Sequence, residues 1–188
     1  MMVNDNEVLK SQYDVIAGAL PNDQVKDGVY EIALVVDKYN QITDNMLYAL
    51  GYIELMSMFG DIISEFLNLD IKTPMPEEYS FKDFLGKEFK LVLEKDFYKF
   101  NAQSNLYELI TDKAESVNNI TDNAVTLRIA GILRPKENVS NGSINGVIGY
   151  TESLAKYVIN QTNQSDIVKA QRLDYEKYKE KTTNEEVV

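Results

Sequence analysis

The sequence predicts an α+β fold with a mixed or mostly antiparallel sheet and several packed helices. Residues 29–36 and 124–133 are β-branched, apolar runs that are typical of buried strands. Residues 52–67 instead carry apolar side chains at i, i+3, i+4 and i+7 spacing, which indicates an amphipathic helix. Segments of these two kinds do not alternate regularly along the chain, and this irregular order favours the α+β class.

Turn residues separate the first two expected strands. Residues 11–17 are typical of a short strand, and Gly18 with the Leu-Pro pair that follows it begins a polar loop. This loop ends at Gly28, and the buried strand at 29–36 begins directly after it.

Capping residues mark the helices that come next. Thr43 or Asp44 can cap a helix that runs to about Leu50, with Gly51 at its end. The amphipathic helix follows, and residues 72–79 end it and form a linker.

The middle of the chain combines one short helix with strands. Ser80 and Asp83 form a capping box for a single helical turn that Gly86 closes. Residues 87–95 alternate apolar and charged side chains, so we expect a half-buried strand there. Residues 104–111 fit either a strand or a helix.

The last third of the chain combines strands with two capped helices. From Arg172 onward the sequence is charged and polar, and we expect this tail to fray. The other expected elements are, in order, a polar loop at 112–123, the strand at 124–133, a short strand within 144–150, a helix from Thr151 to about Asn160 and a helix that Ser165 caps.

These elements group into one domain. A chain of 188 residues fits one domain on a prior of roughly 100–200 residues per domain. We assign residues 11–171 to a single α+β domain, or to part of a larger one. Because the chain begins with two Met residues, we expect residues 1–10 to be disordered or an artificial start. Residues 172–188 are expected to form a charged tail.

Hydropathy predicts no membrane-crossing helix in this chain. The most apolar stretch, 46–69, is broken by Glu54, Asp61 and Glu65, and no run of about 18 uncharged apolar residues occurs. The start lacks a basic region followed by an apolar run, so it does not resemble a signal peptide. We expect that targeting or membrane segments of a longer parent protein would lie outside this sequence.

Composition excludes several classes of site. The chain has no Cys and no His, which rules out a zinc finger, a thiol protease, a redox dithiol and a Ser-His-Asp triad. The net charge is -11, which argues against a nucleic-acid partner because such binders need a basic face. We assign no catalytic, cofactor-binding or metal-binding residue from the sequence, and we expect no cofactor.

Two short patterns resemble catalytic or phosphate-binding motifs. Ser153 and Lys156 match the S-x-x-K of penicillin-recognising serine enzymes, in which the Lys can take the proton of the Ser. The Ser-x-Asn at Ser143 precedes this motif instead of following it, and no K-T-G follows, so a solvated helix face explains the pair better. Gly142, Gly146 and Gly149 fit neither phosphate-loop spacing, so a loop followed by a strand with backbone bends is favoured.

Other side chains have an ordinary interpretation as well. A pair of carboxylates could hydrolyse a glycoside, but a solvated acidic surface is favoured. The Met residues near the amphipathic helix could accept apolar ligands, although core packing is favoured. The carboxylates considered are Glu77, Glu78, Asp96, Glu108, Glu185 and Glu186, and the methionines are Met56, Met58 and Met75.

Two blocks of sequence resemble the extracytoplasmic domain of MacB/FtsX-like ABC transporter permeases, above all those of low-GC Gram-positive bacteria. Their order and spacing carry the resemblance, and "FLGKEF" at 84–89 resembles a strand entry of the same family. The first block comprises 13–21 (YDVIAGALP), 30–37 (YEIALVVD) and 40–51 (NQITDNMLYALG), and the second comprises 127–137 (LRIAGILRPKE), 144–151 (INGVIGYT) and 167–171 (IVKAQ).

The resemblance implies a MacB-like fold at the extracellular face of the cytoplasmic membrane. Such a domain belongs to a membrane-anchored permease whose partner is a separate cytoplasmic ATP-binding subunit. The domain itself would be non-catalytic. It would bind a substrate or partner and relay ATPase-driven motion, for export of a peptide, lipoprotein or antibiotic or for control of a cell-wall enzyme.

Two alternatives stay open at this point. A surface or secreted hydrolase that uses paired carboxylates would account for the acidic surplus. A free-standing cytosolic interaction domain would account for the lack of catalytic motifs.

Overall fold

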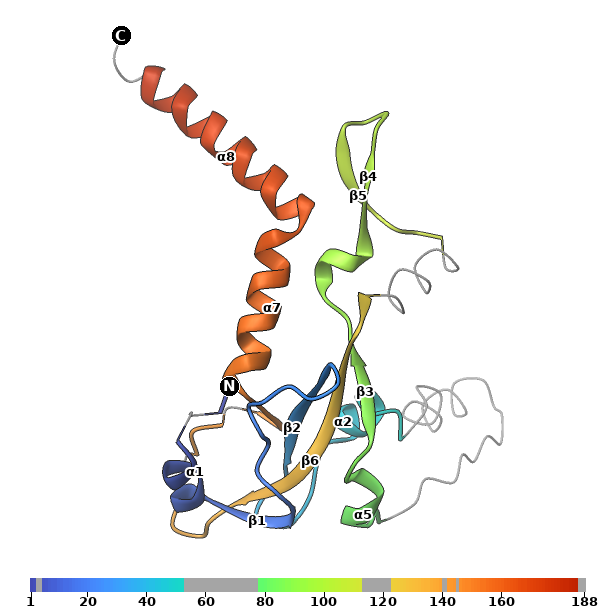
Figure 1. Ribbon diagram of the computed structural model, residues 1–188, viewed down its shortest axis with the longest axis vertical. Coiled ribbons are helices and arrows are strands. Elements are labelled where there is room, and N and C mark those ends of the chain that lie inside the picture. Colours follow the sequence, from blue (N-terminus) through green and yellow to red (C-terminus); the bar gives the residue numbers. More distant parts are fainter. Residues whose placement is uncertain (3–4, 53–77, 113–122, 140–141, 145, 186–188) are drawn as a thin grey trace, which may run out of the picture. The chain divides into compact units, whose positions relative to one another are not determined.

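The protein has an α+β fold with a mixed sheet, as the sequence predicts. Its contacts group the chain into two units, which are described separately: unit 1 comprises residues 1–89 and 127–152, and unit 2 comprises residues 90–126 and 153–188. The computed structural model describes residues 1–2, 5–52, 78–112, 123–139, 142–144 and 146–185, with side chains described to residue 179 (Figure 1).

The main sheet is built around its longest strand, β6. The order along the sheet is β1-β6-β2-β7, and β3 also pairs with β6. Two of the residues of β6, Ile132 and Leu133, are fully buried at 0 % exposure, which explains why this run is so apolar. The strands are β1 (Tyr13–Gly18), β2 (Val29–Val35), β3 (Glu88–Leu91), β6 (Val125–Pro135) and β7 (Ile148–Tyr150).

Backbone register brings distant segments together. Strands β1 and β6 are antiparallel, with Gly18 opposite Gly131, and the register shifts between Val15 and Ala17. Strands β2 and β7 are also antiparallel, with Ala33 opposite Gly149. The first and last thirds of the chain therefore form one sheet.

Side chains of β3 and β6 reinforce their pairing. Within unit 1, Arg128 donates from Nη2 to the Glu88 carboxylate at 2.6 Å. Within unit 2, the ammonium of Lys90 donates to the Thr126 hydroxyl at 2.8 Å. From the first contact to the second, the residue number rises by two in β3 (Glu88 to Lys90) and falls by two in β6 (Arg128 to Thr126). This is the pattern of an antiparallel pair.

Helix α1 (Asn6–Gln12) corrects the prediction of a disordered start. Asp5 caps it by accepting hydrogen bonds from the amides of Glu7 and Val8. Met2 and Leu9 are buried at 5 % and 2 % exposure, so residues near the start belong to the core of unit 1. Burial of these two apolar side chains supplies the stabilisation that a short helix lacks by itself.

The predicted caps of the other short helices are confirmed. In α2 (Asp44–Ala49), the Thr43 side chain accepts a hydrogen bond from the amide of Met46. In α5 (Phe81–Phe84), Ser80 and Asp83 make both bonds of the capping box. The amphipathic helix expected from residue 52 lies, apart from Tyr52, outside the described residues.

Unit 2 contains a β-hairpin that includes most of residues 104–111, the region that fits either a strand or a helix in the sequence. The predicted strand at 87–95 ends at Leu91, and the 3-10 helix η1 (Glu94–Phe97) follows. Strands β4 (Tyr98–Asn101) and β5 (Leu106–Leu109) then pair with each other, so the strand alternative for 104–111 is correct.

Two helices, α7 (Glu152–Gln164) and α8 (Asp166–Glu185), end the described chain. Ser165 accepts a hydrogen bond from the amide of Val168 at 3.4 Å, as expected of a cap. The prediction of a fraying tail from Arg172 is wrong, because α8 extends to Glu185. Its Lys- and Glu-rich sequence favours a helix, and ion pairs such as Lys177 with Asp174 add to this preference.

The hairpin gives a testable pH effect at Glu108. Ser104 donates a hydrogen bond to this carboxylate at 2.6 Å and Asn101 donates another at 2.9 Å. These bonds, Ser104 first, lower the pKa of Glu108 because they favour its charged form. Its contribution to hairpin stability is therefore present above the ordinary pKa of Glu and is lost as the pH falls through the lowered value.

We expect Ser104→Ala to move the titration midpoint of Glu108 upward, as measured by carboxyl chemical shifts in NMR. The matched control is Ser11→Ala, since Ser11 lies on α1 in the other unit and bonds only the local carbonyl of Val8 among the described groups. If both variants keep the midpoint of the unchanged protein, the Ser104 bond is not the main cause of the shift.

Candidate functional site

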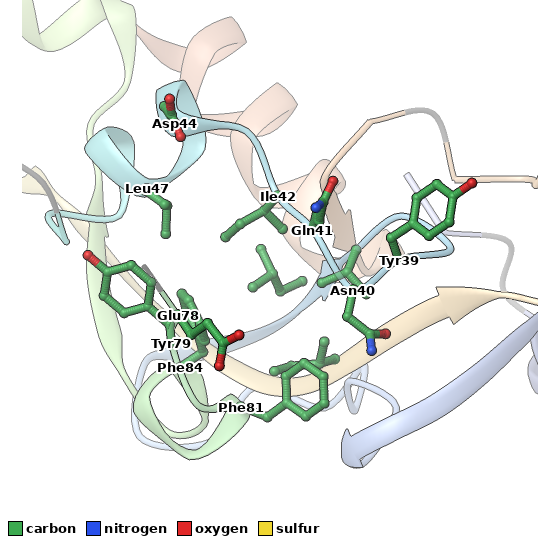
Figure 2. Close-up of a pocket in the computed structure, with 13 residues that line it drawn as sticks. Tyr39, Asn40, Gln41, Ile42, Asp44, Leu47, Glu78, Tyr79, Phe81 and Phe84 are labelled. Carbon is green, nitrogen blue, oxygen red and sulfur yellow. The ribbon is translucent and has the colours of Figure 1, made fainter. Parts of the chain in front are cut away.

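A pocket of about 820 Å³ lies in unit 1 beside the main sheet (Figure 2). Its floor is a buried, apolar base that consists of Leu34 of β2, Val36 directly after that strand, and Ile132 of β6. These side chains are almost fully buried, so the floor is a continuation of the core.

One wall is the loop that connects β2 to α2. Its turn is closed by the Asp37 carboxylate, which accepts hydrogen bonds from the amides of Tyr39 and Gln41, both at 2.8 Å. Asn40 adopts a left-handed conformation with φ of 64°, and its side-chain oxygen accepts a hydrogen bond from Arg134 of β6. The loop is thus tied both to itself and to the central strand, which positions Tyr39, Asn40 and Gln41 along the pocket.

The opposite wall is the segment that enters α5. Tyr79 and Phe84 line the pocket and pack with Tyr52, at ring-centroid distances of 5.3 Å between Tyr52 and Tyr79 and 4.6 Å between Tyr52 and Phe84. The Tyr52 hydroxyl donates to the backbone carbonyl of Asp83, and the ammonium of Lys87 lies 3.6 Å from the Tyr52 ring centroid. Burial, followed by the charge of Asp83, raises the pKa of Tyr52. This aromatic cluster gives the wall a defined shape.

Two carboxylates, from separate segments of the chain, are among the residues that line the pocket. Asp44 is the first residue of α2, and Glu78 precedes α5, as Figure 2 shows. Neither makes a salt bridge with a described residue, and none of the described lining residues is Lys or Arg. An apolar floor, aromatic walls and carboxylates together suit a ligand that has an apolar body and a positive charge.

The charge of the chain is concentrated in the unit that holds this pocket. Unit 1 has 9 Lys or Arg against 18 Asp or Glu in its sequence, a net charge of -9. Unit 2 has 10 against 12, a net charge of -2. Cations are therefore attracted mainly to unit 1.

The S-x-x-K pair lies on a helix of unit 2, and neither residue lines the pocket of unit 1. Ser153 and Lys156 are one turn apart on α7, and Lys156 is exposed. Ser143 belongs to unit 1, and the side chain of Lys181 lies outside the described residues.

The three glycines serve packing and backbone geometry. A Cβ at Gly142 would overlap the hydroxyl of Tyr13, and one at Gly149 would lie 2.9 Å from the sulfur of Met2. Gly146 has a φ of 112°, which L side chains rarely adopt. Gly142 and Gly146 precede β7 and Gly149 lies within it, as expected of a loop followed by a strand.

The carboxylates considered from the sequence are distributed over both units. Glu78 lines the pocket of unit 1, whereas Asp96 and Glu108 belong to unit 2. Asp96 is buried and pairs with the ammonium of Lys95. The other candidates, Glu77, Glu186 and the three Met residues, lie outside the described residues, as does the side chain of Glu185.

Sequence reasoning did not identify this pocket. Asp44 is read as a possible helix cap, and the aromatic residues beside the predicted caps receive no functional role. Tyr39 next to a polar turn and Phe81 with Phe84 at i, i+3 spacing were the available signals. They became a site because two loops far apart in sequence lie over the same strands.

A second cavity, of about 610 Å³, lies within unit 2 between the hairpin and α8. Its lining is more apolar and includes Phe100 and Leu106 of the hairpin and Leu173 of α8, which are 51 %, 62 % and 63 % exposed. This groove is an exposed apolar surface, and its lining also includes Glu94 and Asp174 together with Lys95 and Lys177.

Searches for known sites and relatives add no assignment. In the part of the chain that the structure describes, no three Asp, Glu, His or Cys residues gather as metal ligands. No described helix combines the length and apolar character needed to cross a membrane. A scan against protein-family models finds no match, and searches of curated proteins and of solved structures find no significant similarity.

Proposed function

We propose that this chain is the extracytoplasmic domain of a MacB/FtsX-family ABC transporter permease. In this role it binds a substrate or partner outside the cytoplasmic membrane and relays motion driven by a separate cytoplasmic ATP-binding subunit. The cargo would be a peptide, lipoprotein or antibiotic, or the domain would control a cell-wall enzyme. The chain itself would carry out no catalytic step.

The observation that carries the proposal is where the two resembling blocks lie. The block at 13–21 includes β1, and it pairs with β6 from the block at 127–137. The segment at 30–37 includes β2, and it pairs with β7 from the segment at 144–151. The segments that resemble the family therefore lie next to each other in one sheet. We expect this if the resemblance reflects a sheet that this chain and the family have in common.

This framework also supports a relay. The paired strands hold the pocket floor, and the Arg134–Asn40 hydrogen bond joins the pocket loop to β6 at 3.2 Å. A ligand that ordered the loop would thus act directly on the central strand. Rigid, hydrogen-bonded elements of this kind can pass a local change to a distant segment.

The topology can be tested by labelling a single cysteine, because this chain has none of its own. Asn138→Cys, at an exposed position of unit 1, is introduced into the full parent permease, and intact cells are treated with a membrane-impermeant maleimide. We expect labelling of the variant above that of the unsubstituted parent. A cysteine in the ATP-binding subunit should be labelled only after permeabilisation, and the same result for Asn138→Cys would overturn the proposal.

A surface or secreted hydrolase remains the second candidate, since Asp44 and Glu78 line one pocket. Two carboxylates about 5–10 Å apart are sufficient for glycoside hydrolysis. This candidate requires that chromogenic nitrophenyl glycosides be cleaved and that Asp44→Asn or Glu78→Gln abolish the cleavage. If the unchanged protein releases no more nitrophenol than buffer does, or if the variants cleave equally well, the hydrolase is excluded for these substrates.

A further inference from the structure

We infer that the pocket of unit 1 binds a cationic, amphiphilic peptide segment, in which a Lys or Arg stands next to an apolar side chain. The inference rests on the proposed function and names the class of molecule that the domain would take. It commits to a peptide because the pocket combines an apolar floor with two carboxylates from separate segments of the chain.

The apolar part of such a segment has a defined place. Half-buried Ile42 and Phe81 supply accessible apolar surface in the pocket lining. The lining also includes Leu34, Val36 and Ile132, which are almost fully buried and have no polar side-chain atoms. A cavity of about 820 Å³ can hold several side chains, and burying an apolar one is worth about 1.5–3 kcal/mol.

The Lys or Arg of such a peptide would pair with carboxylates in the pocket lining. Asp44 and Glu78 line the pocket, no described lining residue is Lys or Arg, and neither carboxylate forms a salt bridge with a described residue. A Lys or Arg that enters would supply the missing partner. The net charge of -9 on unit 1 adds a long-range attraction that raises the rate of encounter.

Aromatic rings of this region already bind cations within the chain. The Lys87 ammonium lies 3.6 Å from the Tyr52 ring centroid, and the Lys38 ammonium lies 4.9 Å from that of Tyr39. Tyr79, which packs on Tyr52 and is half-buried, presents a further ring to the pocket. Rings and carboxylates together favour a cation more than either would alone.

The direct test measures fluorescence polarisation of a labelled hexapeptide of alternating lysine and leucine. We expect saturable binding to the unchanged chain, and binding at least tenfold weaker for hexapeptides in which serine replaces leucine or glutamate replaces lysine. Binding should weaken but persist when salt rises from about 0.1 M to 0.5 M, because screening removes the long-range attraction and leaves the buried contacts.

Two double variants of equal charge separate the pocket from the general acidity of unit 1. Asp44→Asn with Glu78→Gln should weaken binding at least tenfold. Asp14→Asn with Asp27→Asn changes two exposed carboxylates that do not line the pocket, and it should leave binding within twofold. Glu78→Gln alone, which changes no helical residue, should weaken binding at least threefold and guards against a folding defect in the double variant.

Equal weakening in the two double variants would overturn the inference, because it would show attraction by net charge without a site. Absence of saturable binding, or equal binding of the glutamate peptide, would overturn it as well. The cysteine-labelling result is independent of these outcomes. If the cysteine is labelled as expected but the peptide does not bind, the proposed function stands and only the peptide ligand is excluded.

Discussion

Gly131→Ala should lower the free energy of unfolding by about 3 kcal/mol, one of the largest effects expected for a change this small. A Cβ at this position would collide with the backbone carbonyl oxygen of Ala19. The obstacle is backbone that is held in place by the hydrogen bond from the Ala19 amide to the Ala130 carbonyl, at 3.0 Å. Relief therefore requires β1 and β6 to separate, which disturbs the pairing of the two resembling blocks.

Urea unfolding followed by circular dichroism measures this effect, and Gly28→Ala provides the control. No atom lies within 4 Å of a Cβ at Gly28, but its φ of 74° disfavours an L side chain. We expect a cost of about 1–2 kcal/mol for the control from backbone conformation alone. A loss at Gly131 no greater than that at Gly28 would contradict the close approach of the strands.

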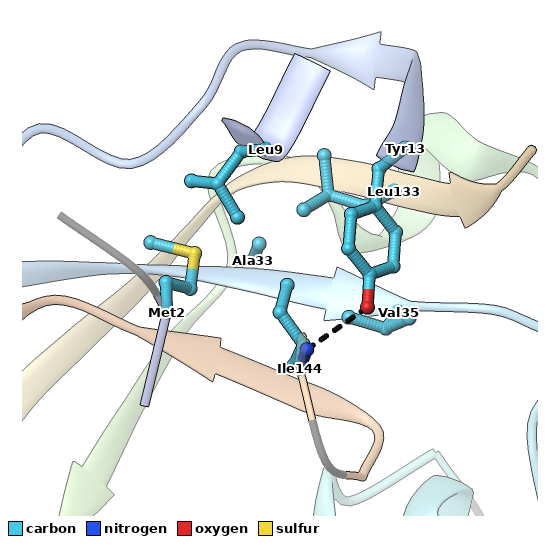
Figure 3. Packing of buried hydrophobic residues seen from close by; sticks show 7 residues of the cluster. All are labelled: Met2, Leu9, Tyr13, Ala33, Val35, Leu133 and Ile144. Carbon is cyan, nitrogen blue, oxygen red and sulfur yellow. Dashed lines mark hydrogen bonds between the residues drawn. The ribbon is translucent and has the colours of Figure 1, made fainter. Parts of the chain in front are cut away.

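Tyr13→Ala is expected to cost about 3–5 kcal/mol, because Tyr13 is the largest side chain in a buried hydrophobic cluster of unit 1 (Figure 3). Its ring is 3 % exposed and packs in the cluster that includes Leu9 of α1 and Leu133 of β6. Its hydroxyl accepts a buried hydrogen bond from the amide of Ile144 at 2.9 Å. The residue thus links the first helix, the central strand and the segment before β7.

Tyr13→Phe separates the two contributions. It keeps the ring but leaves the Ile144 amide without its acceptor, which should cost about 1–3 kcal/mol. Tyr175→Ala on α8 is the control, because this tyrosine is 63 % exposed and its loss should change stability by no more than about 0.5 kcal/mol. Equal stability of the Tyr13→Phe variant and the unchanged protein would show that the hydroxyl contributes nothing net.

The elements that sequence reasoning identified depend on neighbours along the chain. Thr43, Ser80 and Ser165 cap helices by bonds to amides two or three residues ahead, so the signal and its effect lie in the same short segment. The run at 124–133 is likewise apolar because β6 is buried, and strand periodicity reports this directly. Such features can be predicted without knowing the rest of the fold.

The elements that sequence reasoning missed depend on contacts elsewhere. Helix α1 has a capping residue in Asp5, but its place in the fold requires burial of Leu9 against other segments. Helix α8 lacks a clear apolar stripe, and its Lys- and Glu-rich sequence indicates a tail as readily as a helix. Composition alone does not distinguish a helix from a frayed tail.

By itself the sequence determined the α+β class, the buried strand runs and the helix caps, because hydrogen bonds and apolar periodicity act over a few residues. Only the tertiary structure decided the pairing of Gly18 with Gly131, the burial of Met2 and Leu9, and the presence of Asp44 and Glu78 in the lining of one pocket. Each of these depends on how segments that are far apart in sequence pack together. Residue order specifies such contacts only through the complete fold.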